Sequence, residues 1–403
     1  MVPASLFLAF AFGYFLTHLF RVVNAVAGPA ISAELAIDAA ELGFLTSVYF
    51  LAFAAFQLPL GILLDRYGPN RVQAALLVIA AAGSALFALG EDLATLTIGR
   101  ALIGLGVSAG LMSAFKAYSA RLPAEKLPLA NGLHLAAGSL GVLAGGLPVE
   151  LAMHALGWRG VFLGLAALSL AAAAGLFFGV RDTGIGNGSD SFGALVGGVG
   201  QVLVSPVFVR LAPLSVAVQA SGMAMIALWV GPWLRDVAGY SPDRAATILS
   251  LMGVAMIVGY ALCGVLTNRL VALGVSLTKV MIGGYLLYCA MLPLIIVIEP
   301  ASAAPIWLAF ALFISFGPLS YPVLGVLFPA TLTGRVHTGL NFLVFVAAFV
   351  LQWTFGVVVE ALIPSLGVEH AYDAALWGLV GVQAAGLVWY VLRGPAGSTV
   401  PAR

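Results

Sequence analysis

Two long apolar runs of this chain are separated by Gly61-Ile62-Leu63-Leu64-Asp65-Arg66-Tyr67-Gly68-Pro69-Asn70-Arg71. We expect one apolar helix to end near Leu64 and the next to begin at Val72, with a tight polar turn between them. The turn gathers several charges, although only 8% of the residues are charged and 62% are hydrophobic. In such a chain, a charged turn between two apolar helices is expected at a membrane surface.

The composition of the 403 residues is that of a protein embedded in lipid. Soluble proteins carry about 25% charged residues, far more than this chain, whose mean hydropathy is +1.10. The net charge of +1 gives no reason to expect a nucleic-acid partner. The cysteines, Cys263 and Cys289, lie in apolar runs, so we expect neither disulfides nor a metal site. Without a Walker loop, dinucleotide fingerprint or catalytic triad, we expect no cofactor and no enzyme.

Runs of about 20 apolar residues, the length needed to cross a bilayer, occur twelve times. They lie near 5–28, 42–64, 72–90, 95–118, 130–151, 159–180, 206–231, 243–266, 277–298, 305–327, 337–362 and 373–392. We interpret the first as a transmembrane helix rather than a removable signal. The polar, glycine-rich stretch 181–205 is expected to be a flexible linker. The predicted fold is an all-α membrane protein, with one six-helix bundle over 1–180 and another over 206–403.

Loop charge predicts the orientation, because basic residues collect on the cytoplasmic side of membrane proteins. If the N-terminus is cytoplasmic, that side carries Arg66, Arg71, Arg121, Lys126, Arg181, Arg210, Arg269, Lys279, Arg335, Arg393 and Arg403. The other side carries Arg159, Arg235 and Arg244. We therefore expect a multi-pass protein of the inner (cytoplasmic) membrane, with both termini and the linker in the cytoplasm.

The two predicted bundles repeat one another in sequence. Gly61-x-Leu63-x-Asp65-Arg66 returns as Gly264-x-Leu266-x-Asn268-Arg269 after 203 residues. A shift of 210 pairs four further features, namely Asn131 with Asn341, Gly146 with Gly356, Glu150 with Glu360, and Leu156-Gly157 with Leu366-Gly367. These matches indicate two parallel, pseudo-symmetric six-helix repeats.

Three motifs give the sequence its resemblance to the major facilitator superfamily. The stretch Gly61–Arg71 resembles the signature loop between that family's second and third helices, although Pro69 and Asn70 replace its usual basic residue. Gly99–Gly106 resembles the Arg-x-x-x-Gly-x-Gly motif of helix four, and Gly157–Phe162 resembles the loop opening helix six. The resemblance covers the whole chain and implies twelve helices and secondary transport by alternating access. It also implies a gating or conformational role for Gly61, Asp65, Arg66, Arg71, Arg100, Asn268 and Arg269.

Polar side chains inside predicted spans are candidates for substrate binding, because they are costly to keep in lipid. The candidates are Tyr14, His18, Arg21, Asn24, Lys116, Gln219 and Asn341. Tyr14, His18 and Arg21 share one helix face. With few acids inside the membrane, the cations predict an anionic substrate, which a guanidinium binds well. The alternative for Arg21 is that it reaches toward the outer interface.

The stretch Phe20–Ile31 also resembles the first helix of the superfamily's organic-anion:cation symporters, with Phe20 replacing a frequent Asp. We expect a proton gradient to drive transport, because no ATP-binding motif is present. The proton-coupling candidates are His134, His18, Glu150 and Glu360. The predicted protein is a monomeric, proton-coupled symporter of a small anion. The alternatives are a proton-driven exporter of drugs or metabolites, and a non-transporting receptor or assembly factor.

Overall fold

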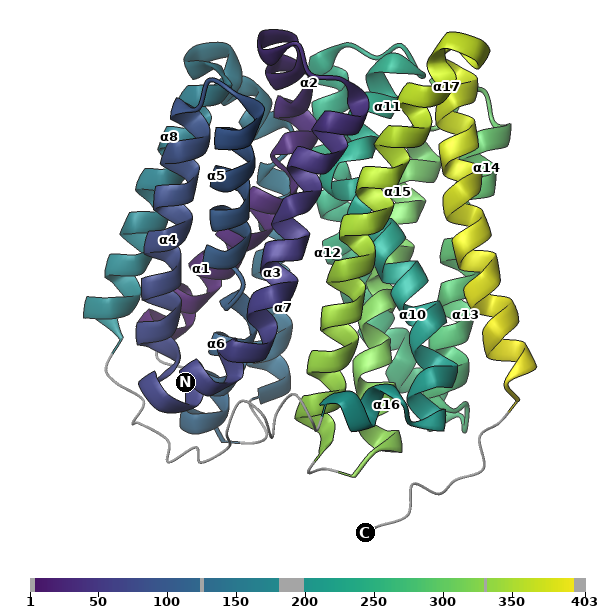
Figure 1. The fold of residues 1–403 in the computed structure, drawn as a ribbon. Helices are drawn as coiled ribbons and strands as arrows, with labels where there is room; N and C mark the ends of the chain where they lie inside the picture. The colour runs from purple at the N-terminus through teal and green to yellow at the C-terminus, as the bar shows by residue number, and fades with distance from the viewer. Residues whose placement is uncertain (1–3, 124–126, 181–198, 330–331, 395–403) are drawn as a thin grey trace.

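The structure, a computed structural model, describes residues 4–123, 127–180, 199–329 and 332–394 (Figure 1). The first half of the chain consists of α1 (Ala4–Val22), α2 (Asn24–Leu35), α3 (Ala39–Tyr67), α4 (Pro69–Leu89), α5 (Leu93–Gly106), α6 (Gly110–Arg121), α7 (Leu127–Ala144) and α8 (Leu147–Gly179). We call it the N-half. The described residues contain helices and connecting turns but no strand, which confirms the predicted all-α class.

The second half, the C-half, follows the predicted linker. It consists of α10 (Pro206–Ala224), η2 (Met225–Trp229), α11 (Val230–Asp236), α12 (Pro242–Ala272), α13 (Leu277–Cys289), α14 (Met291–Val297), η3 (Pro300–Ser302), α15 (Ala304–Phe313), η4 (Ile314–Leu319), α16 (Ser320–Leu327) and α17 (Thr333–Leu392). Most of the linker, 181–198, lies outside the described residues, while 199–203 are helical.

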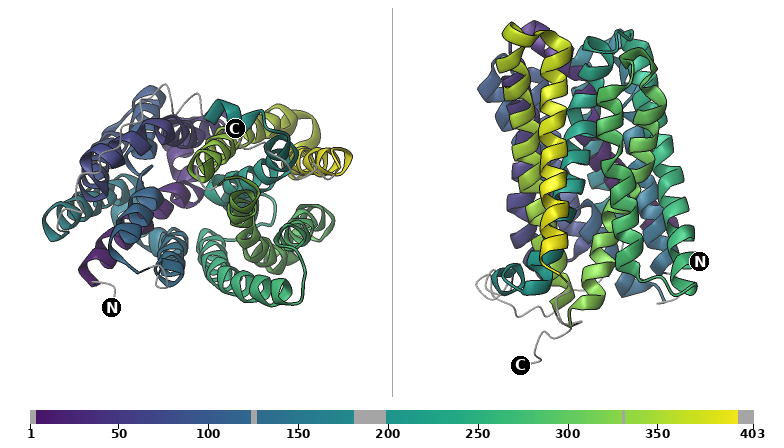
Figure 2. Two further views of the ribbon diagram at one scale, coloured as in Figure 1. Left: turned by 90° about the horizontal axis from the view of Figure 1, so that it is seen from below. Right: turned by 90° about the vertical axis from the view of Figure 1, so that its right-hand side faces the viewer.

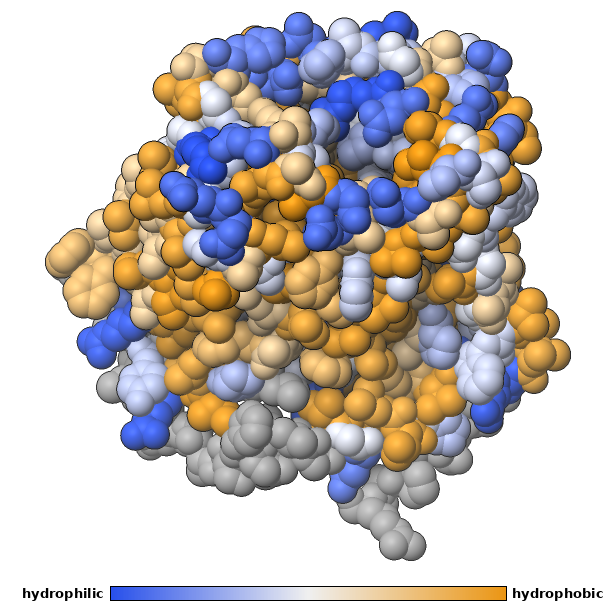
Figure 3. Space-filling view, turned by 45° about the horizontal axis from the view of Figure 1, so that its top comes forward, coloured by the Kyte–Doolittle hydropathy of each residue, from blue (hydrophilic) through white to orange (hydrophobic). Residues whose placement is uncertain are grey.

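The two halves stand side by side with their helices roughly parallel (Figures 1 and 2). Helix α1 begins and α17 ends on the same side of the molecule, which we call the terminal side. The opposite, distal side carries α2, α11 and the bend of α17. On the face seen in Figure 3, a belt of hydrophobic side chains crosses the middle of the molecule below a polar distal rim, as expected for a protein that crosses a bilayer.

Glycine bends explain how the helices relate to the twelve predicted spans. Nine helices among the described residues are long and apolar enough to cross a membrane, or ten when α1 and α2, bent by 45°, count as one span. Helices α8 and α17 each contain two segments that meet at a glycine with positive φ, Gly157 and Gly367. If α17 is divided at Gly367, it gives two spans. If α8 is divided at Gly157, its first segment joins α7 to make one span and its second segment makes another. The structure is then consistent with twelve spans.

The polar turn between the apolar helices on either side of Gly68 is shorter than predicted. Helix α3 continues to Tyr67 rather than ending near Leu64, and α4 already begins at Pro69. Gly68 alone makes the turn, with φ of 82° and ψ of 153°, a conformation that glycine adopts without strain. Pro69 occupies the first helical position, where its missing N–H costs no hydrogen bond.

The halves meet along two seams on the distal side. Helix α3 packs against α17, and α7 packs against α12. Backbones approach closely at two glycines, because a Cβ on Gly356 would lie 2.4 Å from the Ala39 carbonyl oxygen and one on Gly146 would lie 2.5 Å from the Ala246 carbonyl oxygen. These two glycines were paired by the sequence repeat, so equivalent positions of both halves approach the opposite half closely.

Candidate functional site

A cavity of about 80 Å³ lies between the two halves, near the middle of the bundle. The N-half contributes His18 and Arg21 from α1, and the C-half contributes Gln219 from α10 and Tyr260 from α12. The remaining lining side chains are apolar and include Met223 from α10. A larger groove of about 750 Å³ lies against α10 and α17, but its lining is almost entirely apolar and offers no charged group to a solute. The cavity between the halves is therefore the candidate site.

Arg21 is the cation of this cavity. Its guanidinium lies 5.3 Å from the ring centre of Phe345 and 6.0 Å from that of Phe53, which places it between rings from both halves. Its Nε atom is buried and has no hydrogen-bond partner within the described residues. The ion pairs found in that part of the chain all involve other cations. Arg21 thus presents a half-buried positive charge, and no carboxylate of the described residues lies within 4 Å of it.

Arg100 differs from Arg21 although both are arginines inside the N-half. It is 1% exposed, and its Nη1 donates to the Phe20 carbonyl oxygen at 2.8 Å. Its guanidinium also lies 4.9 Å from the ring centre of Tyr49. Phe20 precedes the break between α1 and α2, so Arg100 supports the bent helix from behind. It does not line the cavity.

Three aromatic side chains form a stack beside the cavity. The ring of Tyr14 lies parallel to that of His134 and edge-on to that of His18, with ring centres 4.5 Å apart in both pairs. His18 Nδ1 lies 3.2 Å from the Tyr14 carbonyl oxygen. The close packing depends on Gly138 of α7, since a Cβ there would lie 2.6 Å from the Tyr14 ring and 2.8 Å from that of His18.

His134 is fully buried, and both of its ring nitrogens have partners. Nε2 lies 3.2 Å from the Gly110 carbonyl oxygen, and Nδ1 lies 3.2 Å from the Tyr118 hydroxyl. A carbonyl oxygen only accepts hydrogen bonds, so Nε2 carries the proton and Nδ1 accepts from Tyr118. This network fixes one neutral tautomer inside the N-half, away from the cavity lining.

Of the other predicted substrate-binding residues, Gln219 alone is among the cavity-lining residues. It donates its amide to the Ser320 hydroxyl at 3.2 Å. Asn24 is fully buried, with neither amide atom hydrogen-bonded within the described structure. Asn341 accepts from the Tyr321 hydroxyl at 3.0 Å, and Lys116 is half-buried on α6. Asn24, Asn341 and Lys116 do not line the cavity.

The two candidate acids lie at the distal seams rather than in the cavity. Glu360 accepts from the Ala39 backbone N–H at 3.2 Å, across the α3–α17 seam. Glu150 lies near the start of α8, 3.3 Å from His154. At the α3–α17 seam, Gln352 of α17 also donates to the Thr46 hydroxyl of α3 at 2.8 Å. Polar contacts therefore hold the halves together on the distal side.

Apart from Arg100, the predicted gating residues lie toward the terminal side. Gly61 and Gly264 are exposed, and a Cβ added to either would meet no atom within 4 Å. The remaining exposed members are Arg66, Arg71, Asn268 and Arg269. The side chain of Asp65 lies outside what the structure describes. Among the described atoms, the glycines of the terminal-side motif thus have no close neighbour at the Cβ position, in contrast to those of the distal seams.

Sequence analysis overlooked a second repeated pair. Tyr118 contacts His134, and Tyr321 contacts His337, with edge-on rings whose centres lie 5.7 and 5.4 Å apart. The two pairs are related by the same shift of 203 that relates Gly61 to Gly264. A comparison of the whole sequence with itself at this shift of 203 residues would have paired Tyr118 with Tyr321. Tyr260 and Phe345, which lie near Arg21, carried no comparable signal, because an aromatic residue in an apolar run is ordinary.

An all-helical membrane bundle with a small polar cavity between two related halves defines a class, that of polytopic solute transporters. The model of the Major Facilitator Superfamily matches residues 10–351, most of the chain, and the chain belongs to that family. Members are secondary transporters that work by alternating access, and they are not enzymes.

Among known proteins, a probable sulfoacetate transporter of Cupriavidus necator, SauU, is 28% identical over 157 residues, which cover 39% of this chain and 36% of that protein. A probable L-galactonate transporter of Escherichia coli is 26% identical over 181 residues, covering 45% of this chain and 40% of that protein. Both matches span less than half of the relative's length.

Among solved structures, a bacterial homologue of the human lysosomal transporter Spinster, in an inward-facing and unoccupied conformation, aligns with a TM-score of 0.76. The identity is 16%, and the alignment covers 98% of this chain and 97% of that one. A D-xylose–proton symporter aligns with a TM-score of 0.72 and 16% identity, covering 97% and 98%. These likenesses show the fold.

Proposed function

We propose that this protein transports a small organic anion, whose charged group binds Arg21 in the cavity between the halves. The observation that carries the proposal is a half-buried guanidinium that lines the cavity and has no carboxylate partner among the residues the structure describes. A cation so placed is stabilised when a ligand brings a negative charge, and guanidinium binds carboxylate, sulfonate or phosphate through parallel hydrogen bonds. Gln219 and Tyr260 line the cavity from the other half, which supports a contact with the remainder of the solute.

Two relatives support the same substrate class. SauU is named for sulfoacetate and the Escherichia coli relative for L-galactonate, both small organic anions. We propose an anion of similar size. A cavity of about 80 Å³ has room for only two or three water molecules in its present form, since each occupies about 30 Å³. The halves must therefore separate slightly as the solute enters.

We further propose that a proton moves with the anion and that His18 carries it. His18 lies in the cavity one turn from Arg21, whereas His134 uses both ring nitrogens in internal hydrogen bonds. Glu150 and Glu360 lie at the distal seams and are second candidates. The functional unit would be one chain, because the cavity lies between two halves of the same chain.

The proposed orientation places the terminal side in the cytoplasm, with both termini and the linker there. The basic loops support it through the positive-inside rule. The packed distal seams and the unpacked Gly61 and Gly264 then correspond to a state closed to the outside. A cysteine introduced at Ala301, which is exposed in η3 on the distal side, should react with an impermeant maleimide added outside intact cells. Absence of labelling there, with labelling at Gly264, would reverse the orientation.

Uptake into proteoliposomes tests the function. Purified protein is reconstituted, and uptake of radiolabelled sulfoacetate and galactonate is compared with uptake of neutral sugars, with and without an inward proton gradient. We expect gradient-stimulated uptake of an anion, its loss in Arg21→Ala, and loss of gradient stimulation in His18→Gln. Uptake of neutral or cationic solutes alone would contradict the proposed substrate class. Anion uptake unaffected by the gradient would contradict the coupling.

A further inference from the structure

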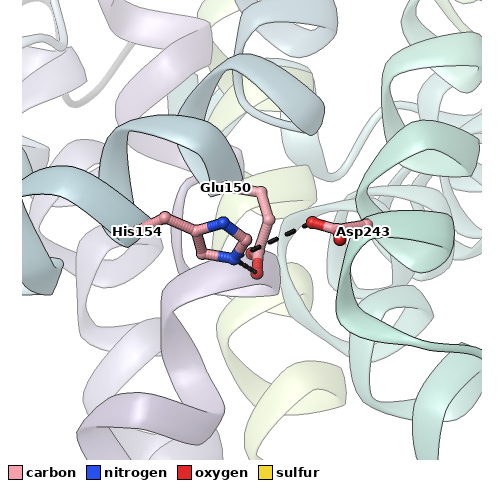
Figure 4. A group of neighbouring side chains, drawn as sticks. All are labelled: Glu150, His154 and Asp243. Atoms are coloured by element: carbon pink, nitrogen blue, oxygen red, sulfur yellow. Dashed lines mark ion pairs between the residues drawn. The ribbon is translucent and has the colours of Figure 1, made fainter.

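Three side chains with metal-binding atoms meet at the distal seam, outside the cavity (Figure 4). Glu150 and His154 lie one turn apart on α8 of the N-half, and Asp243 lies in the first turn of α12 of the C-half. His154 Nε2 is 3.3 Å from Glu150 Oε1 and 3.8 Å from Asp243 Oδ1. The three donor atoms all lie within 4.8 Å of one another. The sequence did not reveal this cluster, because Asp243 belongs to the other half.

The spacing suits a tetrahedral ion. Zinc bonds of about 2.0–2.1 Å at tetrahedral angles place neighbouring ligand atoms about 3.3–3.4 Å apart. The His154–Glu150 distance matches this value, and the longer distance to Asp243 needs only a small rotation of a side chain that is 63% exposed. One imidazole with two carboxylates favours a zinc-like ion over magnesium or calcium, which prefer oxygen ligands alone.

Glu150 supplies a buried negative charge to the cluster. Its side chain is 8% exposed, whereas that of His154 is 56% exposed. Within the described residues, His154 is the one ion-pair partner of Glu150, and a neutral imidazole supplies no positive charge. A buried carboxylate without a full counter-charge is unfavourable, and a divalent ion would supply it. Arg235 lies within electrostatic range of Glu150, so we expect moderate rather than very tight affinity.

We propose that Glu150, His154 and Asp243 bind a zinc-like divalent ion that bridges the two halves on the distal side. The ligands come from α8 and α12, so the bound ion holds the α7–α12 seam closed. Alternating access requires that seam to open, and a ligand that binds only the closed state shifts the population toward it. The ion would therefore act as an inhibitor that reaches the protein from the distal side.

Direct titration of the purified full-length protein with zinc chloride tests the proposal. Isothermal titration calorimetry should show one ion per chain for the wild type. His154→Ala removes a ligand from the N-half, and Asp243→Asn removes one from the C-half. Each should weaken zinc binding at least about ten-fold, because changes even beyond the direct ligands cost 10–100-fold in metal sites. Zinc should also raise the melting temperature of the wild type more than that of either variant.

A matched control uses a similar pair elsewhere. The exposed His370 lies 3.5 Å from Asp373. Both residues belong to α17 and so to one half, and His370→Ala should therefore bind zinc like the wild type. Excess magnesium should not compete. Wild-type zinc affinity in Asp243→Asn would overturn the bridge between the halves, and an equal loss in His370→Ala would show non-specific surface binding. Equal melting temperatures of all variants without zinc would show that each is folded.

Discussion

The N-half and the C-half share backbone features but line the cavity with different chemistry. Gly157 and Gly367 bend their helices with nearly the same dihedral angles, φ of 65° and 77° with ψ of 169° and 172°. By contrast, the N-half places Arg21 and His18 in the cavity, and the C-half places Gln219 there. The backbone repeat serves a motion that both halves share. The cavity side chains of the two halves need not be alike for that motion. Each half can therefore bind a different part of the same solute.

The strongest test of this division compares Arg21 with Gln219. Arg21→Ala should reduce anion affinity by about 2–5 kcal/mol, the range for truncating a buried charge pair, or roughly 30- to 5,000-fold. Gln219→Ala should cost about 1 kcal/mol, as for a neutral hydrogen bond. Arg21→Lys should fall between them, because it keeps the charge but loses the planar fork. Binding is measured by calorimetry once a transported anion is identified.

Two outcomes would contradict this assignment of roles. Wild-type affinity in a folded Arg21→Ala protein would make Arg21 an interface anchor and remove the main argument for an anionic substrate. A larger loss from Gln219→Ala than from Arg21→Ala would move recognition to the C-half. The melting temperature of each variant serves as the folding control.

Much of the fold was predictable from sequence, because the signals are local. Span length, turn composition and loop charge are properties of short segments, and they gave the all-α class and the approximate positions of the spans. Even the shared bend at Gly157 and Gly367 follows from the 210-residue repeat. The turn at Gly68 was predicted too long, because apolar periodicity does not show that one glycine followed by a proline can reverse the chain.

The site was less predictable, because it depends on which helices pack together. The sequence showed that helix one offers Arg21 no nearby acid, but not that Phe53 and Phe345 enclose its guanidinium. Nor could it show that His134 is held by Gly110 and Tyr118 while His18 reaches the cavity. Both histidines had similar sequence contexts. Only the tertiary contacts distinguish a histidine occupied by hydrogen bonds from one that faces a solute.

A second prediction concerns the glycines at the seams. Gly146→Ala and Gly356→Ala each place a Cβ about 2.5 Å from a backbone carbonyl of the opposite half, and such overpacking typically costs 1–3 kcal/mol. The closed state should lose that free energy. A cysteine at Ala246, buried in the seam, should therefore react with maleimide roughly 5- to 150-fold faster. Cys263 and Cys289 are first replaced by serine.

Gly378→Ala provides the control, because a Cβ at that α17 position meets nothing within 4 Å. It should leave the labelling rate unchanged. If only one of the two glycine substitutions raises the labelling rate, the two seams do not open symmetrically, and the halves differ in the motion as well as in the cavity. If neither matters, the seams do not gate access.

The smallest expected effect comes from comparing two buried hydrogen bonds. One joins the two halves, and the other lies within the C-half. Gln352 donates to the Thr46 hydroxyl across the α3–α17 seam, and Gln383 donates to the Ser221 hydroxyl inside the C-half, both at 2.8 Å and both buried. Hydrogen bonds between transmembrane helices average about 0.6 kcal/mol. Thr46 keeps its own bond to the Leu42 carbonyl oxygen at 2.8 Å, so Gln352→Leu leaves the Thr46 hydroxyl with an acceptor for its proton.

Gln352→Leu should raise the maleimide labelling rate at the Ala246→Cys site about three-fold. Gln383→Leu should lower the melting temperature slightly and leave the labelling rate unchanged. Equal labelling in both variants would mean that Gln352 supports the C-half rather than the closed seam.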